Sequence, residues 1–297
     1  MNDDERPHAL VNTFFECLPK FTGLQRLYTD GIQLTQRGIV NLVAFEERIN
    51  PRSSTLRVTS FTTLDDSMSN IWISLLSREA LQELNPDYGS LQNLSFLETS
   101  AIFPVLEKYT GAYGNVHIFV QRPTLTHILL NSQFPFLYLL DELEGITALP
   151  NITSLTARFT NAFGKTEIET LFTLFPRLTE LRLTLLPYVE EHDELTTEPT
   201  SFLPMLAANA LLPSTLISLS LDWDSVSPPD PADIPNFTGL RDELIARCPG
   251  LNYIFLDGYH FLYVWWKTSW VWEATAHSYD DAEALRAKKN ERKVLIS

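Results

Sequence analysis

Cysteine and glycine are scarce in this chain, and their scarcity excludes several classes of protein. The two cysteines, Cys17 and Cys248, are too few for a disulfide framework. Both lie near a proline at the apolar end of a helix-like segment, so we expect buried structural thiols. The 11 glycines are scattered, and the sequence has no P-loop, GxGxxG or GxSxG motif. No two histidines or cysteines have the spacing of metal ligands. We therefore expect a protein that is not an enzyme and that uses no cofactor and no metal.

Basic residues are outnumbered, and long apolar runs are missing as well. The net charge of -15 argues against a broad basic surface for nucleic acid or for an anionic membrane. No stretch approaches the ~18 apolar residues of a membrane span, and no apolar signal-peptide region follows the acidic start Met1–Glu5. We expect a cytoplasmic or nuclear protein with no nucleic acid and no membrane among its partners. The charge permits a basic partner, although solubility is the simpler explanation of the acidic composition.

What the chain does contain is one repeated pattern, which is clearest at Leu174–Leu183. An amphipathic helix ends at Pro176, because proline cannot continue a helix. The sequence Leu178-x-x-Leu181-x-Leu183 follows, and its last two leucines share one face of a strand because strand side chains alternate. A unit of this kind cannot bury its own apolar face, so it is stable only in a stack of similar units.

The same pattern recurs along most of the chain. Four times, a set of apolar residues at helical spacing is followed by a proline and a leucine-rich strand. The corresponding helices are expected near residues 11–18, 168–175, 203–210 and 240–248. The strand patterns are expected to start at residues 24, 56, 81, 106, 125, 152, 178, 216 and 251. The irregular period of roughly 25–38 residues leaves room for a strand and a helix. The sequence therefore predicts an α/β fold, a leucine-rich-repeat solenoid (horseshoe) with a parallel concave β-sheet and convex helices.

The pattern changes after Leu256. Aromatic and aliphatic residues alternate over Tyr259–Trp266 and resume at Trp270–Trp272, so both faces of these segments are apolar. We interpret them as an aromatic β-hairpin that covers the open end of the stack, because terminal repeats need a cap. A stacking platform for sugars or bases is the alternative interpretation.

A final helix is predicted after this hairpin. Ser278-x-x-Asp281 resembles a capping box and would begin a helix that extends from Asp280 to about Lys289. The expected domains are therefore a repeat solenoid over residues 1–256 and a capping hairpin and helix over residues 257–297.

Two irregular segments interrupt the repeats. The acidic run Glu190–Glu194 is interpreted as a solvated loop ahead of a helix, with weak cation binding as the alternative, and Ser227–Pro231 as a second loop. Asp222 and Asp224 have the residue types of an acid and a base, but exposed carboxylates at a strand end are the commoner case. We therefore propose no catalytic residue.

With these motifs, the chain resembles the divergent leucine-rich-repeat region of F-box/LRR proteins, of the fungal type, over about Leu10–Leu256. The residues that carry the resemblance are Leu178, Leu181 and Leu183 after Pro176, Leu216, Leu219 and Leu221 after Pro213, and Leu251, Ile254 and Leu256 after Pro249. The resemblance implies a protein-binding module, the substrate-recognition part of an SCF-type ubiquitin ligase receptor. In that family an F-box docks on the Skp adaptor.

The F-box itself is lacking ahead of the first repeat, so the Skp adaptor is expected as a partner only if a missing F-box precedes Met1. The alternative is a repeat-only scaffold or recognition protein with no ubiquitin-ligase link. A hydrolase or transferase without a visible motif is a third possibility.

The repeat also predicts which residues bind the partner protein. The third, fifth and seventh positions of each unit point to the concave face, because the fourth and sixth are buried. The predicted protein-binding residues are Arg26, Tyr28, His127, Asn131, Ser154, Arg158, Glu180, Arg182, Ser220, Asp222, Tyr253 and Asp257. Arg182 and Tyr253 are the expected hot spots by residue type.

Overall fold

The computed structural model contains two compact units, Met1–Thr126 (the N-terminal unit) and His127–Ser297 (the C-terminal unit). It describes residues 24–29, 60–63, 81–86, 104–160, 163–186, 188–190, 193–195, 199–223, 236–258, 261–267, 271–276 and 278–286. Several predictions concern residues outside these ranges. They are the helix at 11–18, Cys17, Asp224, the loop at 227–231 and Trp270. The predicted domain boundary after residue 256 stays a prediction.

The N-terminal unit contains short parallel strands that follow one another in chain order. They are β1 (Arg26–Thr29), β2 (Ser60–Thr63), β3 (Glu83–Pro86) and β4 (Lys108–Gly111). The strands expected from patterns that start at residues 24, 81 and 106 are confirmed. A 3-10 helix, η5 (Tyr113–Ile118), follows β4 and was not predicted.

The predicted register of β2 is wrong by two residues. Leu27 of β1 is aligned with Phe61, and Phe61 is aligned with Leu84 of β3. A pattern that starts at Leu56 would have placed Thr59 in that column instead. In the sequence, the apolar residue at this register position is Phe61, whereas position 59 is a threonine, so Leu56 is not the first position of this unit.

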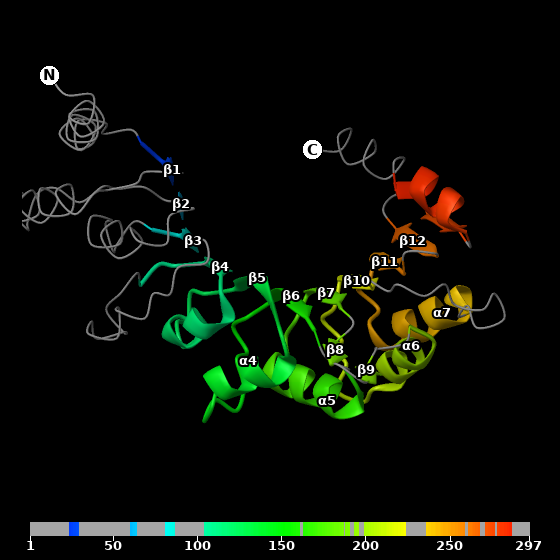
Figure 1. Ribbon diagram of the computed structural model, residues 1–297, viewed down its shortest axis with the longest axis horizontal. Coiled ribbons are helices and arrows are strands. Elements are labelled where there is room, and N and C mark those ends of the chain that lie inside the picture. The colour runs from blue at the N-terminus through cyan, green and yellow to red at the C-terminus, as the bar shows by residue number, and fades with distance from the viewer. Residues whose placement is uncertain are drawn as a thin grey trace, which may run out of the picture. The chain divides into compact units, whose positions relative to one another are not determined.

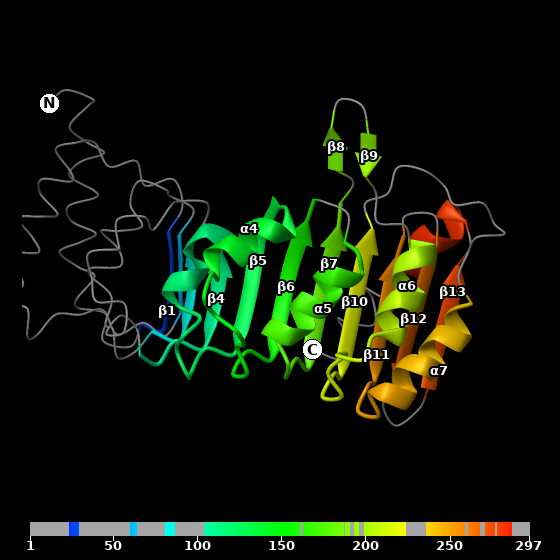
Figure 2. The same cartoon turned by 90° about the horizontal axis from the view of Figure 1, so that it is seen from below.

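The C-terminal unit contains five parallel strands in chain order, followed by two antiparallel ones (Figure 2). The parallel strands are β5 (His127–Phe134), β6 (Ser154–Phe159), β7 (Glu180–Leu185), β10 (Ser218–Trp223) and β11 (Tyr253–Asp257). Each lies at the position expected from the leucine pattern. The α/β class and the mostly parallel sheet are therefore confirmed.

Strand register lines up the repeated leucines in two apolar columns. The first column is Leu155, Leu181, Leu219 and Ile254, and the second is Ala157, Leu183, Leu221 and Leu256. None of these side chains is more than 1% exposed. The fourth and sixth positions of the repeat are therefore core positions, as the alternation of strand side chains predicts.

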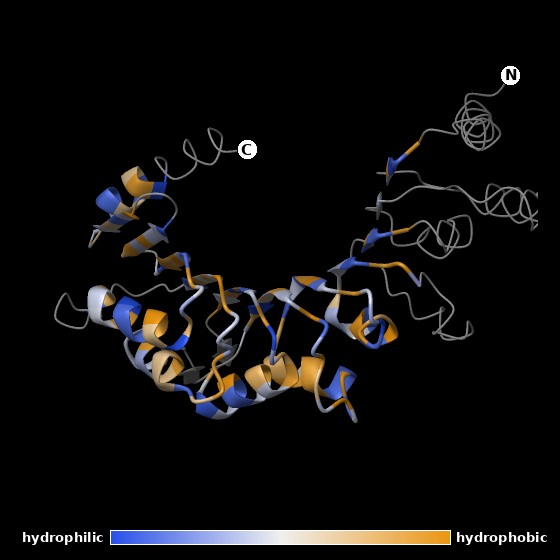
Figure 3. Cartoon of the chain, turned by 180° about the vertical axis from the view of Figure 1, so that it is seen from behind, coloured by the Kyte–Doolittle hydropathy of each residue, from blue (hydrophilic) through white to orange (hydrophobic). Residues whose placement is uncertain are grey.

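Helices cover one face of these strands (Figure 1). They are α4 (Phe136–Glu142), α5 (Lys165–Leu174), α6 (Pro199–Ala208) and α7 (Phe237–Arg247). Each of α5 and α6 carries both hydrophobic and hydrophilic residues (Figure 3), and α5 buries Ile168, Leu171 and Phe172. The helices predicted near 168–175, 203–210 and 240–248 are confirmed, whereas α4 was not predicted. Ala210, an expected apolar position, is exposed because α6 ends before it.

Aromatic rings add a continuous row of contacts beneath the helices. Neighbouring centroids are 5.0–6.2 Å apart along the row. The row runs through Phe134, Phe159, Phe163, Phe202, Trp223, Phe261, Phe237 and Tyr263. It links strands and helices from one end of the unit to the other, and aromatic pairs add to the stabilisation from burial alone.

Threonine hydroxyls join the turns of successive repeats. Thr179 donates its hydroxyl to the carbonyl of Thr153 at 3.0 Å, and Thr215 donates to the carbonyl of Leu178 at 2.8 Å. The backbone N–H of Ile217 donates to the carbonyl of Thr179 at 2.7 Å. These bonds satisfy polar groups just ahead of the strands, so they help to hold the register.

Cys248 is buried at the end of α7 and forms no disulfide. Its thiol donates to the carbonyl of Pro213 at 3.2 Å, and burial raises the pKa of the thiol to about 11. The expectation of a buried structural thiol is confirmed for this cysteine.

The acidic run Glu190–Glu194 was predicted to be a loop, and this prediction is wrong for Glu190, Asp193 and Glu194. These residues belong to two short antiparallel strands, β8 (Tyr188–Glu190) and β9 (Asp193–Leu195), which extend beyond the ends of the main strands (Figure 2). Glu191 and His192 lie outside the described residues. The hairpin was missed because the segment is strongly acidic and lacks the Asn-Gly or Asp-Gly signal of a tight turn.

The C-terminal hairpin and helix are present. β12 (Leu262–Lys267) pairs with β11 and with β13 (Val271–Ala276), antiparallel in both cases. A helix over residues 279–286 begins after Ser278, whose hydroxyl accepts the backbone N–H of Asp281 at 3.2 Å. The predicted N-terminal cap is confirmed; the helix starts one residue earlier than expected.

Both faces of β12 are covered, which explains its continuous apolar sequence. Leu262 and Val264 pack in one cluster with Ala282 and Leu285 of the C-terminal helix. On the opposite face, the ring of Tyr263 stacks on Phe237 of α7, and Trp265 is only 3% exposed. Trp265 is therefore a core residue rather than part of a stacking platform.

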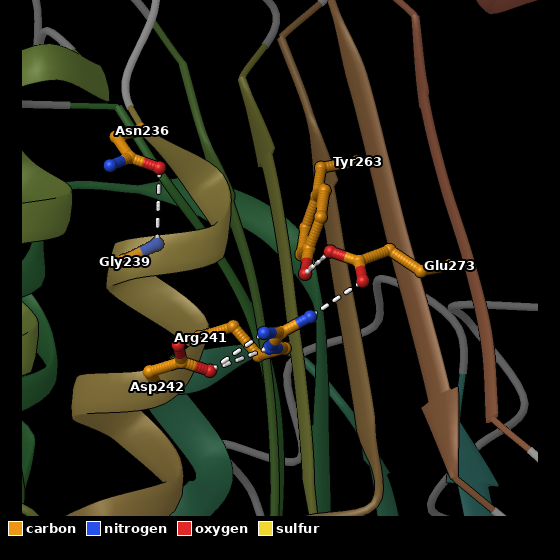
Figure 4. Close-up of polar contacts among 6 residues, drawn as sticks. All are labelled: Asn236, Gly239, Arg241, Asp242, Tyr263 and Glu273. Atoms are coloured by element: carbon orange, nitrogen blue, oxygen red, sulfur yellow. Dashed lines mark hydrogen bonds and ion pairs between the residues drawn. The ribbon is translucent and has the colours of Figure 1, made fainter.

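A polar network ties α7 to the hairpin (Figure 4). Arg241 of α7 is paired with Glu273 of β13 and with its neighbour Asp242. The hydroxyl of Tyr263 donates to Glu273 at 2.8 Å. Burial raises the pKa of the Tyr263 hydroxyl, and the hydrogen bond to Glu273 raises it further. The tyrosine therefore stays a neutral donor at physiological pH.

We expect Leu181→Ala to lower the free energy of unfolding by about 2–5 kcal/mol, because it leaves a cavity in an apolar column. The same change at Leu137, a leucine that is 58% exposed, is the matched control and should have little effect. Urea denaturation followed by circular dichroism measures both. Equal effects of the two substitutions would contradict the assignment of the column to the core.

Candidate protein-binding face

The strand face opposite α4–α7 carries polar side chains between the buried leucines. On β6 these are Thr156 and Arg158, on β7 Arg182 and Thr184, and on β10 Asp222. None of these five side chains is buried, while their strand neighbours are. Because strand side chains alternate, the packing of the leucines against the helices directs these residues to the other side. We call this surface of the C-terminal unit the polar face.

A pocket of about 660 Å³ lies on the polar face. Strands and the C-terminal helix both contribute to its wall. It is lined by Leu129, Leu130, Asn131, Thr156, Arg158, Arg182, Thr184, Asp222, Trp223, Asp257, Tyr279 and Arg286. Its size suits a short peptide segment or several side chains of a partner.

Five of the predicted protein-binding residues line this pocket: Asn131, Arg158, Arg182, Asp222 and Asp257. They belong to the fifth and seventh positions of their repeats. The pocket therefore brings together residues from five successive strands that the repeat had assigned to one face.

The other predicted residues lie outside the pocket. Five of them belong to the same strands but do not line the pocket: His127, Ser154, Glu180, Ser220 and Tyr253. The last two, Arg26 and Tyr28, are exposed on β1 in the N-terminal unit.

Two of these residues interact with side chains on other strands. The hydroxyl of Ser154 donates to Glu180 on the adjacent strand at 3.0 Å. Burial raises the pKa of Tyr253 to about 12, although the positive charge of Arg182 opposes the shift. The charge of Arg182, one expected hot spot, therefore acts on Tyr253, the other, although β10 lies between their strands.

An ion pair forms one wall of the pocket. Arg286 of the C-terminal helix donates from Nε to Asp257 Oδ2 at 2.8 Å and from Nη2 to the other carboxylate oxygen. This hydrogen bonding, opposed by burial, raises the pKa of Arg286, and the charges of Asp257 and Asp222 add to the effect. Asp257 is only 9% exposed. It was predicted as a partner-binding residue, but its carboxylate is occupied by Arg286.

The pocket is more basic than the protein as a whole. Its lining contains three arginines and two aspartates, a formal charge of 3 - 2 = +1, whereas the chain carries -15. Asp257 offsets Arg286. Within the described residues, Arg158 and Arg182 have no carboxylate within ion-pair distance.

Two residues of the pocket lining carry polar atoms without hydrogen-bond partners. Arg158 Nε and Asn131 Oδ1 are buried and have no partner within the part of the chain that the structure describes. Buried polar groups in folded proteins are nearly always paired with protein or with water. Unpaired groups on these two lining residues therefore mark the pocket as a place where a ligand can supply the missing hydrogen bonds.

Sequence reasoning missed the contribution of the C-terminal helix. Tyr279 and Arg286 line the pocket from a segment outside the repeats. Thr156 and Thr184 carried a usable signal, since they occupy the same repeat positions as Arg182 and Arg158. No such signal exists for Tyr279 and Arg286, because a helix that follows the last repeat has no fixed register with the strands.

No protein-family model, no curated protein and no solved structure matches this chain. Within the residues that the structure describes, no helix is long and apolar enough to cross a membrane. Nor do three His, Cys, Asp or Glu side chains gather there as a potential metal site.

We expect Asp257→Asn to loosen the helix over residues 279–286, because it removes the charge that Arg286 binds. A charge-assisted pair of this kind contributes about 1.5 kcal/mol, so amide hydrogen exchange in the helix should become roughly tenfold faster. Mass spectrometry of peptic fragments measures the exchange. The control is Asp242→Asn, which removes a carboxylate from an exposed ion pair of α7. Unchanged exchange in the helix would contradict its attachment through Asp257.

Proposed function

We propose that this chain is a leucine-rich-repeat module that binds a partner protein on the polar face of its C-terminal unit. The observation that carries the proposal is the pocket, to which five successive strands each contribute a non-core position of a repeated unit. Parallel strands in chain order, with helices on the opposite face, support the horseshoe form of a leucine-rich-repeat solenoid.

The chemistry of the lining supports binding rather than catalysis. The described residues that line the pocket include no histidine and no cysteine. Aspartate and arginine are present, but Asp257 is held by Arg286. Arginines, tyrosine and tryptophan are the residue types that dominate binding energy at protein interfaces. We therefore propose that the protein is not an enzyme.

Within this class, the resemblance to F-box/LRR proteins favours the substrate-recognition part of an SCF-type ubiquitin ligase receptor. A repeat-only scaffold or recognition protein is the second candidate. Both bind a protein on the polar face. They differ in whether the Skp adaptor is present in the complex.

Partner capture tests the polar face. We expect Arg182→Glu and Tyr253→Ala each to reduce the recovery of specific partner proteins at least tenfold, because hot-spot substitutions cost about 2 kcal/mol or more. Quantitative mass spectrometry of affinity-purified complexes measures the recovery. Arg177→Glu makes the same charge change at an exposed turn before β7 and should leave the partners bound. If all variants retain the same proteins in the same amounts, the polar face is not the binding surface.

The ubiquitin-ligase link is tested by tagging the gene at its 3′ end in the native cell. We expect the Skp adaptor and a cullin to co-purify with the tagged product, because a receptor of this type carries an F-box that binds the adaptor. The 297-residue chain expressed alone with the same tag serves as the comparison. Recovery of partner proteins without adaptor and cullin would favour the repeat-only scaffold.

A further inference from the structure

We infer that the pocket receives a carboxylate group of the bound partner, held between Arg158 and Arg182. The carboxylate belongs either to an Asp or Glu side chain or to the carboxyl terminus of a peptide segment. This inference rests on the proposed function, that the polar face binds protein.

The two arginines are placed to act on one group. Strand register aligns Arg158 with Thr184 and Thr156 with Arg182. Arg158 and Arg182 are therefore diagonal neighbours on adjacent strands, a relation that separates two residues of a sheet by about 7–8 Å. Two long side chains at that separation can both reach a single carboxylate, whose two oxygens accept hydrogen bonds from guanidinium groups.

The two arginines are also the basic groups of the pocket that have no carboxylate partner among the described residues. Arg286 has one in Asp257. Arg158 in addition has a buried Nε with no hydrogen-bond partner in the described part of the chain. A buried donor on a charged group is costly to leave unpaired, so a negatively charged acceptor would stabilise this arrangement most.

The charge balance favours a carboxylate over a phosphate. The lining carries a formal charge of +1, and Asp222 and Asp257 belong to it. A carboxylate adds one negative charge and neutralises the pocket. A phosphate group carries about -1.5 to -2 at neutral pH, so it would leave the pocket with a net negative charge beside Asp222. The exposed lining residues Leu129 and Tyr279 offer apolar and aromatic contacts for the carbon atoms that bear the carboxylate.

The test begins with peptides selected from a random display library on the full-length chain. The selected peptides are synthesised with a fluorescent label, and fluorescence anisotropy gives their dissociation constants. Three matched forms of each peptide are compared: every acidic side chain changed to its amide, an amidated carboxyl terminus, and phosphoserine in place of the acidic residue. The protein variants are Arg158→Gln, Arg158→Lys and Arg182→Gln, with Arg177→Gln as the control.

We expect each selected peptide to lose at least tenfold in affinity in one of its two amide forms. The form that binds more weakly shows whether the bound carboxylate belongs to a side chain or to the carboxyl terminus. Arg158→Gln and Arg182→Gln should cause a similar loss with the acidic peptide and almost none with its amide form, because the interacting charge is already gone. Arg158→Lys should restore part of the affinity. Thermal unfolding of each variant identifies any that fail to fold. If Arg158→Gln does not fold, Arg182→Gln still tests the inference, because Arg182 is exposed.

Different outcomes overturn different statements. If binding depends on Arg182 or Tyr253 but neither amide form weakens it, the carboxylate inference is wrong and the proposed function stands. If the phosphoserine peptide binds tenfold more tightly than the acidic one, the pocket is a phosphate site instead. If no peptide is selected, or none is sensitive to any substitution on the polar face, the proposed function itself is wrong.

Discussion

Alternation of side chains along parallel strands held in register is the constraint that organises the C-terminal unit. When Leu181 and Leu219 share one column and Leu183 and Leu221 the next, the residues between them must point the other way. A slip of one residue would exchange the two faces completely. The core and the polar face are therefore two consequences of one register, and the hydrogen bonds of Thr179 and Thr215 at the strand entrances help to maintain it.

The C-terminal hairpin and helix both protect the core and complete the pocket. β12 is apolar on both faces because α7 covers one and the C-terminal helix the other. The helix that buries Phe255 also carries Arg286 to Asp257. A structural requirement, covering the last strands, thus places a charged side chain in the wall of the candidate site. Loss of the helix would expose apolar surface and remove one side of the pocket at the same time.

The polar face combines a rigid base with groups that lack partners. Its side chains project from strands rather than loops, so their spacing is set by backbone hydrogen bonds. Arg158 and Arg182 bring positive charge to a protein of net charge -15, and Asp257 offsets only Arg286. This arrangement suits recognition of one negatively charged group with defined geometry. It also explains how an acidic protein can select an acidic segment of a partner, since the local field at the pocket has the opposite sign to the overall charge.

Local periodicity was enough to predict most of the strands, three of the helices and the two faces of the sheet. The alternation of strand side chains and the 3.6-residue period of a helix both depend only on residues that are close together in the sequence. Five pocket residues, Arg158 and Arg182 among them, followed from the same rule. The β8–β9 hairpin, the aromatic row and the Asp257–Arg286 pair could not be predicted in this way. They depend on contacts between segments far apart in the chain, and Asp257 and Arg286 are 29 residues apart with no periodic relation. Sequence assigned residues to a face. The packing of the last helix determined which carboxylate on that face is already occupied and which arginines have no carboxylate partner among the described residues.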